Sequence, residues 1–251
     1  EIKITDQGVL FRSYLDGAEI FLDPKTSIRI QEALGADIMI AFDECPSPVA
    51  DYAYVKSSLA RTHCWAEESL SAKKSKTQSL YGVVQGGRFR DLREESAKFI
   101  GGLPFDGFAI GGEFGGKKAD MKNMIQWIFA ILPKEQPRHL LGIGHPEDIL
   151  PIIKAGVDTF DCIVPTHYAR RGIAFTSEGR MDMRKSLFLK DKKPLDAACN
   201  CFVCGAYSRS YITHLLRARE ITALKLLTFH NLHYFNAVVA GIREKIKNGK
   251  I

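Results

Sequence analysis

Three cysteines within six residues, Cys199, Cys201 and Cys204, are the densest group of reactive side chains in the sequence. Cysteines this close together rarely reach disulfide geometry, whereas three thiolates on one short loop suit a tetrahedral zinc ion. A histidine would supply the fourth ligand and close the site. The spacing therefore predicts a structural zinc, and reduced cysteines indicate a reducing compartment.

The fourth zinc ligand is one of three histidines in the C-terminal segment, His214, His230 or His233. We favour His230 because we expect the segment 229–231 to turn back towards the cysteine loop. The spacing alone leaves His214 and His233 as alternatives. A closed site of four protein ligands also argues against a zinc hydrolase, which needs an open coordination position for water.

Polar residues and glycines follow the short apolar runs of the sequence, where strands are expected to end. In parallel α/β folds the carboxyl ends of the strands meet on one face and build the active site. The residues at these positions are Asp43, Glu44, Cys45, Gln85, Gly86, Gly87, Gly111, Gly112, Gly142, Gly144 and Asp161. Each of these residues could instead have a purely structural role: Asp43 could cap a helix, Gly86–Gly87 could be a turn, and Asp161 could form a salt bridge. Together they predict a cleft.

The chemistry of this cleft follows from its two aspartates, Asp43 and Asp161, the side-chain amide of Gln85, and the backbone groups of its glycines. Such a set suits recognition of a polar heterocycle combined with nucleophilic attack. A carboxylate can attack an anomeric carbon and hold a covalent glycosyl intermediate, as in retaining glycosidases. Neither glycine pair matches a phosphate-cradling loop, so a nucleoside triphosphate site is not expected.

The elements that must position these residues are five apolar runs that alternate with amphipathic segments. The runs are 37–42, 80–84, 105–110, 139–143 and 157–164, and helical spacing follows in 55–70, 92–100, 121–132 and 146–154. Strands apolar on both faces that alternate with helices predict a parallel sheet. Five units could form an open doubly wound sheet, whereas a closed (β/α)8 barrel needs three more.

Different patterns flank this alternating region. Residues 9–15 and 18–22 predict a hairpin around the two-residue turn Asp16–Gly17, and a helix is expected between Asp23 and Gly35. After Pro165 come loops, basic residues and the cysteine cluster, then a largely helical segment over about 208–247. The apolar positions expected to form its packing surface are Ile212, Leu215, Leu216, Ile221, Leu224 and Leu227. We expect a partial barrel with its hairpin over 1–165 and a zinc-binding, helical subdomain over 166–251.

Composition bounds the class of protein. The 251-residue chain is 45% hydrophobic and 25% charged, which is typical of a globular domain and not of a disordered one. Its sequence has no run of about 18 apolar residues and no apolar N-terminal region, so we expect neither a membrane protein nor a secreted one. The net charge of +6 permits an anionic partner without requiring one. The basic residues gather between Arg170 and Lys193.

Six motifs, in chain order, resemble those of the queuine tRNA-ribosyltransferase family, the tRNA-guanine transglycosylases. They are Ala-Phe-Asp-Glu-Cys at 41–45, Tyr-Gly-Val-Val-Gln-Gly-Gly at 81–87, Phe-Asp-Gly-Phe-Ala-Ile-Gly-Gly at 105–112, Leu-Gly-Ile-Gly at 141–144, Gly-Val-Asp-Thr-Phe-Asp-Cys at 156–162 with Pro165–Thr166, and the cysteine cluster. The resemblance covers nearly the whole chain. It implies an α/β fold: a (β/α)8 TIM barrel, incomplete in this chain, with an inserted zinc-binding subdomain and C-terminal helices.

The resemblance also implies a reaction, the exchange of the wobble guanine of certain tRNAs for a 7-deazaguanine, queuine or its 7-aminomethyl precursor. Asp161 would attack the ribose C1′ and form a covalent aspartyl-ribose intermediate. The substrate-binding residues would be Asp43, Cys45, Gln85, Gly111, Gly112, Leu141 and Gly142. Asp43 would bind the edge of the base, Gln85 and the Gly112 backbone its carbonyl side, and Leu141 with Gly142 would form the pocket wall.

Further expectations carried by the resemblance concern metal, RNA and assembly. Cys199, Cys201, Cys204 and His230 would hold a structural Zn²⁺. His167, Arg170 and Arg171 would contact the tRNA anticodon loop, in keeping with phosphate contacts that position an RNA while pocket groups identify the base. We expect a cytoplasmic homodimer with its contacts in the zinc and helical region.

Three features depart from the family pattern. The N-terminal part that carries an Asp-Ser-Gly-Gly motif, whose aspartate acts as general acid/base, is absent, in agreement with the three missing units. His167 stands where an arginine is expected. Gly115 and Lys117 stand where bacterial enzymes that use the aminomethyl base would have a bulkier residue and an acid, so we predict a roomier pocket that accepts queuine.

The sequence is compatible with two other functions. A non-catalytic tRNA-binding partner subunit of a transglycosylase heterodimer would resemble this chain, but Asp161 within Phe-Asp-Cys favours an enzyme. An archaeal-type enzyme that makes the archaeosine precursor is less favoured, since the chain ends after its helical segment with no added RNA-binding domain.

Overall fold

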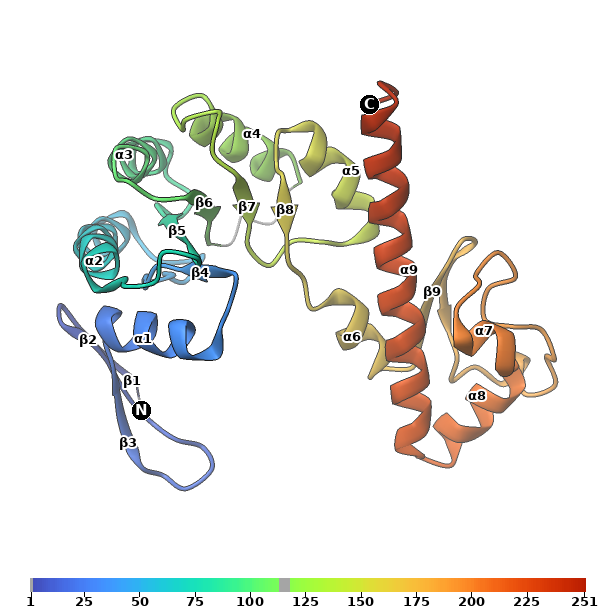
Figure 1. Ribbon diagram of the computed structural model, residues 1–251. Helices are drawn as coiled ribbons and strands as arrows, with labels where there is room; N and C mark the ends of the chain where they lie inside the picture. The colour runs from blue at the N-terminus through green and yellow to red at the C-terminus, as the bar shows by residue number, and fades with distance from the viewer. Residues whose placement is uncertain (1, 113–117) are drawn as a thin grey trace. The chain divides into compact units, whose positions relative to one another are not determined.

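The computed structural model describes residues 2–112 and 118–251 (Figure 1). For residues 118–120 it describes the backbone alone. The chain divides into two compact units, each described below by itself. The first unit comprises 1–141 and 155–160, and the second comprises 142–154 and 161–251. The predicted division at residue 165 stays a prediction.

A three-stranded antiparallel sheet opens the first unit. Its strands are β1 (Ile2–Thr5), β2 (Gly8–Arg12) and β3 (Glu19–Leu22), with Val9 opposite Leu22. The predicted hairpin is confirmed, but its two-residue turn is wrong. Ser13 N–H donates to the Ala18 carbonyl (2.8 Å), so the connection is the whole segment 13–18. Strand β1 was missed because a four-residue strand carries too little alternation to be read.

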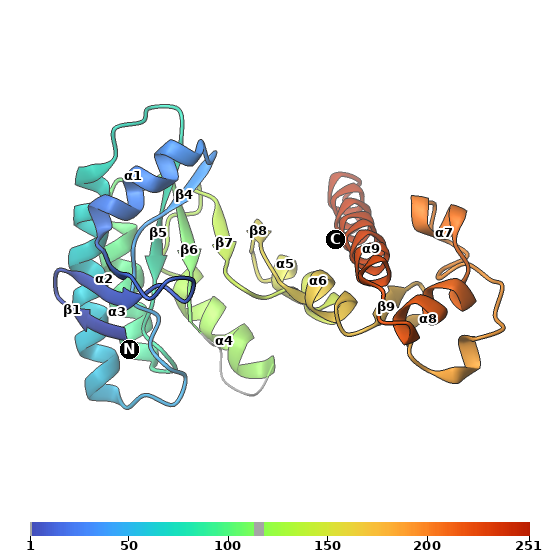
Figure 2. The same ribbon diagram turned by 90° about the horizontal axis from the view of Figure 1, so that it is seen from below.

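The centre of the first unit is a five-stranded parallel sheet in the order β4-β5-β6-β7-β8 (Figure 2). Its strands are β4 (Ile38–Ile40), β5 (Ser79–Val84), β6 (Gly107–Ile110), β7 (Arg138–Leu140) and β8 (Thr159–Phe160). All five lie within the predicted apolar runs or begin one residue before them. Strand order follows chain order, and the curled sheet has the arrangement of an incomplete (β/α)8 barrel.

Four helices of the first unit lie along the outer side of the curled sheet; the first leads into β4, and the other three connect successive strands (Figure 1). They are α1 (Pro24–Leu34), α2 (Tyr52–Ala72), α3 (Arg90–Gly101) and α4 (Lys118–Phe129). The α1 boundaries confirm the prediction: the Asp23 carboxylate accepts from Thr26 N–H (2.6 Å), and Gly35 closes the helix at φ 72°. Helices α2 and α3 pack on β5 through fully buried side chains such as Leu59, Leu92 and Ile100.

The second unit is mainly helical. Its elements are α5 (Pro146–Lys154), α6 (Val164–Ala169), β9 (Ile173–Thr176), β10 (Gly179–Asp182), the 3-10 turn η1 (Ser186–Phe188), α7 (Phe202–Ala206), α8 (Arg209–Arg217) and α9 (Ile221–Lys247). One core joins β9, η1, α7, α8 and α9 through buried residues that include Ala174, Phe188, Val203, Ile212 and Leu227.

Three sequence expectations fail in this unit. Val164 was placed at the end of a strand, but it begins α6, because Pro165 fits the first turn of a helix. The hairpin β9–β10 was read as loop. Ile221 was assigned to packing surface, but it is 77% exposed because it lies at the first position of α9. Among the described residues, no helix is long and apolar enough to cross a membrane.

Candidate functional site

Asp43 and Gln85 meet at the carboxyl ends of neighbouring strands. Gln85 follows β5 directly, is 2% exposed, and its Nε2 donates to Asp43 Oδ2 at 2.7 Å. The Gln85 backbone N–H donates to Ser96 Oγ of α3 (3.2 Å), which fixes where the side chain starts. The convergence predicted from the ends of the apolar runs is confirmed for this pair.

The carboxylate of Asp43 lies where its charge is costly. Burial raises its pKa above the ordinary value; the bond from Gln85 opposes this rise, and the neighbouring carboxylate of Glu44 adds to it. The site thus holds a desolvated carboxylate next to an amide. Such a pair can bind a heterocycle that brings its own N–H donors.

Glu44 anchors the loop that carries Asp43. Its side chain is buried, accepts from the Tyr54 hydroxyl at 2.6 Å and forms an ion pair with Arg61. Its backbone N–H donates to Thr62 Oγ1 (3.1 Å). Glu44 was predicted to lie at the strand end, but no role was predicted for it. Cys45, the next predicted site residue, is exposed.

Gly111 and Gly112 follow β6 and lie against Gln85. A Cβ on Gly111 would come 2.4 Å from Gln85 Nε2, and one on Gly112 would come 2.9 Å from Gln85 Oε1. Gly112 also adopts φ 90°, which disfavours any residue with a side chain. Close approach explains why this strand ends in two glycines, and it brings the Gly112 backbone to the Asp43–Gln85 pair.

Arg93 of α3 holds this corner together. The side chain is 0% exposed and donates to three backbone carbonyls, Gly111 (2.7 Å), Gly87 (2.7 Å) and Val84 (3.2 Å). Sequence reasoning missed it. The only available signal was a charged residue on the apolar face of α3, between Leu92 and Ser96.

Leu141 closes the row of strand ends in the first unit. Its N–H donates to the Ile110 carbonyl (3.1 Å), and its half-buried side chain packs with Tyr81, Val83 and Ala109. In this unit the structure therefore brings together Asp43, Gln85, Gly111, Gly112 and Leu141.

Gly142 and Asp161 belong to the second unit and contact each other. The Gly142 N–H donates to Asp161 Oδ1 at 3.0 Å, so a backbone donor orients the predicted nucleophile. Asp161 is exposed and follows β8 directly in the chain. The next residue, Cys162, lies with its Sγ 3.4 Å from the Gly144 carbonyl.

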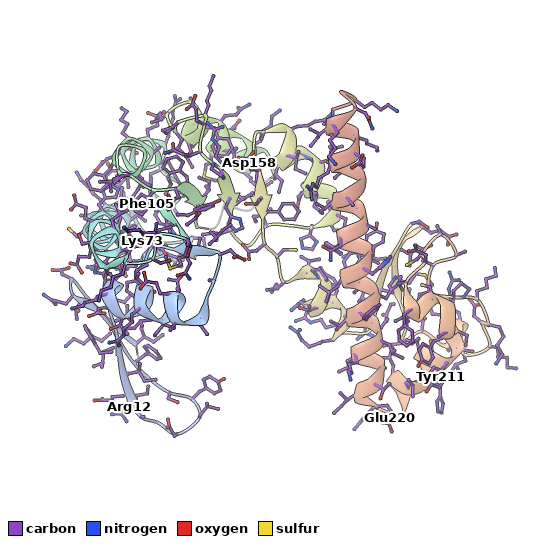
Figure 3. All side chains as sticks on the ribbon, in the orientation of Figure 1. Arg12, Lys73, Phe105, Asp158, Tyr211 and Glu220 are labelled. Atoms are coloured by element: carbon purple, nitrogen blue, oxygen red, sulfur yellow. The ribbon has the colours of Figure 1, made fainter. Side chains whose placement is uncertain are left out.

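The opposite ends of the strands hold side chains in structural pairs. Asp106, just before β6, pairs with Lys73 Nζ (3.0 Å) and accepts from Leu80 N–H (2.8 Å). Asp158, just before β8, accepts from Arg138 N–H at 2.9 Å. Lys73 and Asp158 are labelled in Figure 3. These acids tie strands together, in contrast to Asp43 and Asp161 at the carboxyl ends.

The cysteine cluster and His230 form a set of four converging donor atoms. The Sγ atoms of Cys204, Cys201 and Cys199 lie 3.4, 3.5 and 3.9 Å from Nδ1 of His230. Zinc bonds of about 2.3 Å to sulfur and 2.0 Å to nitrogen at tetrahedral angles require about 3.6 Å between these atoms. All four donor atoms lie within 4.8 Å of one another, so the residues fit a zinc ion.

The surroundings of His230 fit a ligand role. The ring is fully buried, and Nε2 lies 2.8 Å from the Phe175 carbonyl, so Nε2–H donates there and Nδ1 faces the thiolates. Burial lowers the pKa of His230, which favours the neutral, metal-binding imidazole. The choice of His230 agrees with this geometry, but the expected turn at 229–231 is wrong: these residues lie within α9.

The alternative histidines are placed differently. His233, one turn along α9, lies with Nδ1 3.6 Å from Cys199 Sγ, but it is not among the four converging donors. It lines a pocket of about 280 Å³ together with Ser177, Asp196 and Tyr234. His214 is exposed on α8. Neither completes the donor set of the described residues.

The predicted RNA-contacting residues lie at the end of α6. Arg170 and Arg171 are exposed where this helix ends, and half-buried His167 lies beside Tyr168 with ring centroids 5.7 Å apart. The Arg180 guanidinium stacks over the same tyrosine at 5.7 Å. Two exposed guanidinium groups and a nearby aromatic ring suit contacts to RNA phosphates and bases.

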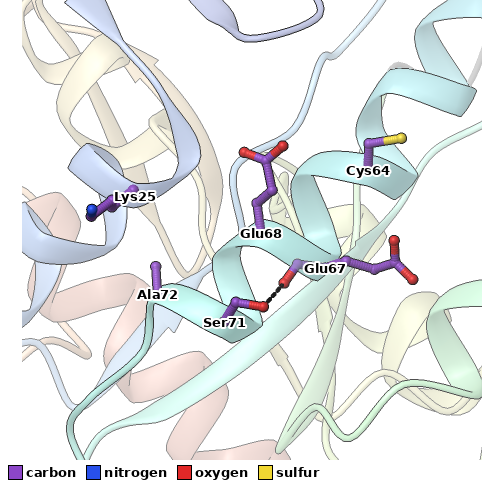
Figure 4. A pocket seen from close by; sticks show the side chains of 6 residues that line it. All are labelled: Lys25, Cys64, Glu67, Glu68, Ser71 and Ala72. Atoms are coloured by element: carbon purple, nitrogen blue, oxygen red, sulfur yellow. Dashed lines mark hydrogen bonds between the residues drawn. The ribbon is translucent and has the colours of Figure 1, made fainter.

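A separate pocket of the first unit lies between α1 and α2. Its volume is about 580 Å³, and it is lined by Lys25, Cys64, Glu67, Glu68, Ser71 and Ala72 (Figure 4). The Ser71 hydroxyl donates to the Glu67 carbonyl (3.0 Å) within the helix. None of the predicted site residues lines it.

Comparison with known proteins decides the family. The model of the queuine tRNA-ribosyltransferase family matches residues 1–251. The chain belongs to the queuine tRNA-ribosyltransferase family. It is similar to the queuine tRNA-ribosyltransferase of Bacillus subtilis strain 168, at 44% identity over 99% of this chain and 66% of that protein. The enzyme of the same name from Staphylococcus aureus strain N315 is 43% identical, with the same coverage. The chain thus spans 66% of the length of these relatives.

Family membership confirms the resemblance drawn from the motifs. The expectation of a roomier pocket depended on Gly115 and Lys117, and both lie outside the described residues.

Proposed function

We propose that this protein is a tRNA-guanine transglycosylase that exchanges the wobble guanine of tRNA for a 7-deazaguanine, queuine or its 7-aminomethyl precursor. The observation that carries the proposal is the desolvated Asp43 carboxylate bonded to Gln85 beside the Gly112 backbone. Membership of the family supports the same reaction. The carboxylate supplies hydrogen-bond acceptors, and the Gln85 amide and the Gly112 N–H supply donors. Together they match the edge of a guanine-like base, which carries both N–H donors and a carbonyl acceptor.

Base recognition follows from the chemistry of each group. The Asp43 carboxylate accepts from the ring N–H and the exocyclic amine of the base, which replace part of the hydration the carboxylate has lost. Gln85 and the Gly112 N–H donate to the carbonyl oxygen. Cys45, Gly111, Leu141 and Gly142 complete the pocket wall. A base that lacks these donors leaves the desolvated Asp43 carboxylate with only its bond from Gln85, which gives specificity.

Asp161 is the nucleophile of the proposed reaction. One carboxylate oxygen attacks C1′ of the ribose and forms an ester bond, while the bond between C1′ and the guanine nitrogen breaks and guanine leaves with the bonding pair and takes up a proton. A ring nitrogen of the incoming base then attacks C1′ and loses its proton, which balances the proton taken up by guanine, and the bond between C1′ and Asp161 breaks to release the carboxylate. The Gly142 N–H, bonded to Oδ1, orients the carboxylate for attack.

The zinc ion has a structural role in this proposal. Cys199, Cys201, Cys204 and His230 would hold it, and four protein ligands leave no position for a reacting water. His167, Arg170 and Arg171 would contact the anticodon loop. We further propose a cytoplasmic homodimer, with 1–165 as the barrel part and 166–251 as the zinc-binding subdomain that supplies the subunit contacts.

Guanine exchange tests the proposal. Full-length protein is incubated with a tRNA that carries labelled guanine at the wobble position, and queuine and its aminomethyl precursor are offered in parallel. We expect wild-type protein to release label with a base. Asp161→Asn should abolish release and the covalent tRNA complex, whereas Asp158→Asn, a matched change just before the same strand, should retain release within about threefold.

Two outcomes would redirect the proposal. A covalent complex formed by Asp161→Asn would show that another residue is the nucleophile. Tight tRNA binding by wild-type protein without any exchange would favour a non-catalytic partner subunit.

A further inference from the structure

Arg93 is a buried cation at the candidate site that the proposed reaction does not use. It lies in the first turn of α3, and its three described hydrogen bonds all go to backbone carbonyls. Burial lowers the pKa of Arg93 to about 10, so the guanidinium stays charged at neutral pH. Burying a charge costs several kcal/mol, and an apolar side chain of similar volume would pack the same corner at lower cost.

The acceptors of Arg93 belong to the two strand ends that form the base site. Val84 and Gly87 flank Gln85 and Gly86 after β5, and Gly111 is the first residue after β6. Gly86 lies so close to α3 that a Cβ would come 2.7 Å from the Arg93 backbone nitrogen. Arg93 therefore fixes the two strand ends against each other.

One of these bonds sets the direction of a neighbouring donor. The peptide between Gly111 and Gly112 is trans, as are all described peptide bonds, so its C=O and N–H point in opposite directions. Because the Gly111 carbonyl points at the Arg93 Nη1, the Gly112 N–H must point away from α3. A hydrogen bond from a cation to the carbonyl also polarises the peptide and strengthens the N–H as a donor.

Arg93 and Gln85 also meet at the same glycine. A Cβ on Gly112 would come 2.8 Å from Arg93 Nη2 and 2.9 Å from Gln85 Oε1. The guanidinium thus lies alongside both groups that would read the carbonyl of the base, the Gln85 amide and the Gly112 N–H.

We propose that Arg93 is a positioning residue that aims and polarises the Gly112 N–H towards the carbonyl oxygen of a bound guanine-like base. The inference rests on the proposed function, because it concerns the same pocket. It predicts that Arg93 contributes to the binding of the carbonyl oxygen and hardly to the rest of the base.

A cycle of one protein change and one ligand change tests this inference. Binding of free guanine and free 6-thioguanine to full-length protein is measured by calorimetry; the two bases share every donor, and sulfur replaces the carbonyl oxygen as a weaker acceptor. We expect Arg93→Lys to weaken guanine binding about tenfold and 6-thioguanine binding less than threefold, since a lysine cannot keep all three bonds. The preference for guanine should therefore shrink.

Arg138→Lys is the matched control. Arg138 Nη2 also donates to two backbone carbonyls of the first unit, Leu132 and Pro133 (both 3.2 Å), at the other end of the sheet. It should leave the binding of both bases within twofold. Equal losses for both bases in Arg93→Lys would reduce Arg93 to a structural residue and overturn the inference. Failure of wild-type protein to bind guanine would instead overturn the proposed function.

A measurement on wild-type protein covers the case in which Arg93→Lys does not fold. In NMR spectra, guanine should shift both the Gly112 amide proton and the Arg93 side-chain N–H signals downfield, because the three groups form one chain of hydrogen bonds. 6-Thioguanine should shift them less. A Gly112 amide that does not respond to guanine would refute the inference without any variant.

Discussion

At the scale of single residues, the site combines groups held in unfavourable states. Asp43 keeps a carboxylate in a desolvated place, and Arg93 keeps a guanidinium with no exposed surface. Such groups lower stability and are retained where binding or chemistry uses them. Replacement of Asp43 should therefore change stability and base binding with opposite signs, whereas Arg93 offsets its desolvation by three bonds to backbone carbonyls.

Asp43→Asn should stabilise the fold and weaken base binding. Because the folded-state pKa of Asp43 is raised, its ionisation opposes folding above the ordinary carboxyl pKa, and this penalty disappears with a neutral amide. We expect a higher Tm at pH 7 and at least about tenfold weaker guanine binding, since the amide is a poor acceptor for two N–H donors. Thermal unfolding and calorimetry measure both.

The control for Asp43→Asn is Asp37→Asn, an exposed aspartate just before the same strand. Asp37→Asn should change neither the Tm nor the affinity for guanine. In wild-type protein, guanine binding should weaken as the pH falls through the raised pKa of Asp43, at a higher pH than for an ordinary aspartate. An Asp43→Asn protein with a lower Tm would contradict the assigned cause of the pKa shift.

His63 of α2 gives the protein a pH dependence of stability. Its ring is buried, stacks on Phe99 with centroids 4.1 Å apart, and lies 3.4 Å from Ser96 Oγ. Burial lowers the pKa of His63 from 6.5 to about 4. Between these values the unfolded chain binds a proton that the folded chain does not, so the free energy of unfolding should decrease as the pH falls.

Urea unfolding between pH 7 and pH 4 measures this effect. The full shift corresponds to roughly 3 kcal/mol, and His63→Gln should remove most of that pH dependence. His214→Gln, at an exposed histidine of α8, should leave the pH dependence as it is in wild-type protein. If both variants retain it, another group is responsible.

Single residues differ in how far the sequence could place them. Asp43 and Gln85 were predictable because the ends of parallel strands converge in any fold of this class. Arg93 and His63 were not, since a helical pattern assigns charged and polar residues to solvent. Glu44 was placed at a strand end, but its burial was not predicted. The burial of Arg93 and Glu44 depends on partners that are distant in the chain, the Gly111 carbonyl and Arg61.

At the scale of elements, close contact between the β5–α3 turn and α3 holds Gln85 in place. Gly86 adopts φ 135°, and a Cβ there would lie 2.7 Å from the Arg93 backbone nitrogen, an atom that cannot move without moving the helix. Gly86→Ala should lower the free energy of unfolding by about 2 kcal/mol, through backbone strain and displacement of α3.

The control for Gly86→Ala is Gly102→Ala at the end of the same helix. Gly102 has φ −85°, and the nearest atom to its added Cβ is 3.4 Å away. Gly102→Ala should lower the free energy of unfolding, measured in urea, by less than about 0.5 kcal/mol. A Gly86→Ala protein as stable as Gly102→Ala would mean that the turn tolerates a side chain and that α3 does not depend on it.

Elements were predictable when they were long or strongly marked. Helix α1 has an aspartate cap, an initial proline and a terminal glycine, and its limits were predicted from those signals. The turn of the β2–β3 hairpin was misplaced because Asp-Gly is a two-residue signal that the bonds between Ser13 and Ala18 override. Helices α6 and α7 and hairpin β9–β10 have too few residues per element for a period to show.

At the scale of the whole molecule, the order of the parallel strands followed from chain order, but membership of the two units did not. Segment 142–154, which carries α5, stands between β7 and β8 in the sequence and yet belongs to the second unit. There α5 contacts α9, a helix that begins at Ile221. Local patterns carry no information about such distant contacts, which depend on side-chain complementarity.

The metal site lies in the core of the second unit. Cys201 belongs to that buried core, with Cys199 and Cys204 packed against it, and His230 connects α9 to the Phe175 carbonyl of β9. Zinc binding is therefore coupled to folding of this unit. Removal of the metal by a chelator should abolish hydrogen-exchange protection in α8 and α9, while β5 and β6 of the first unit, whose core contains no metal ligand among the described residues, stay protected.

Two histidine variants separate a ligand from its neighbour in the same helix. His230→Ala should lose zinc on purification and show the same exchange pattern as chelated protein, whereas His233→Ala should retain stoichiometric zinc, since His233 is not one of the four converging donors. Metal content is measured by mass spectrometry, and protection by hydrogen exchange. Loss of zinc from His233→Ala with retention in His230→Ala would mean that His233, and not His230, is the fourth ligand. Loss of hydrogen-exchange protection in both units on chelation would show that one cooperative transition spans the whole chain.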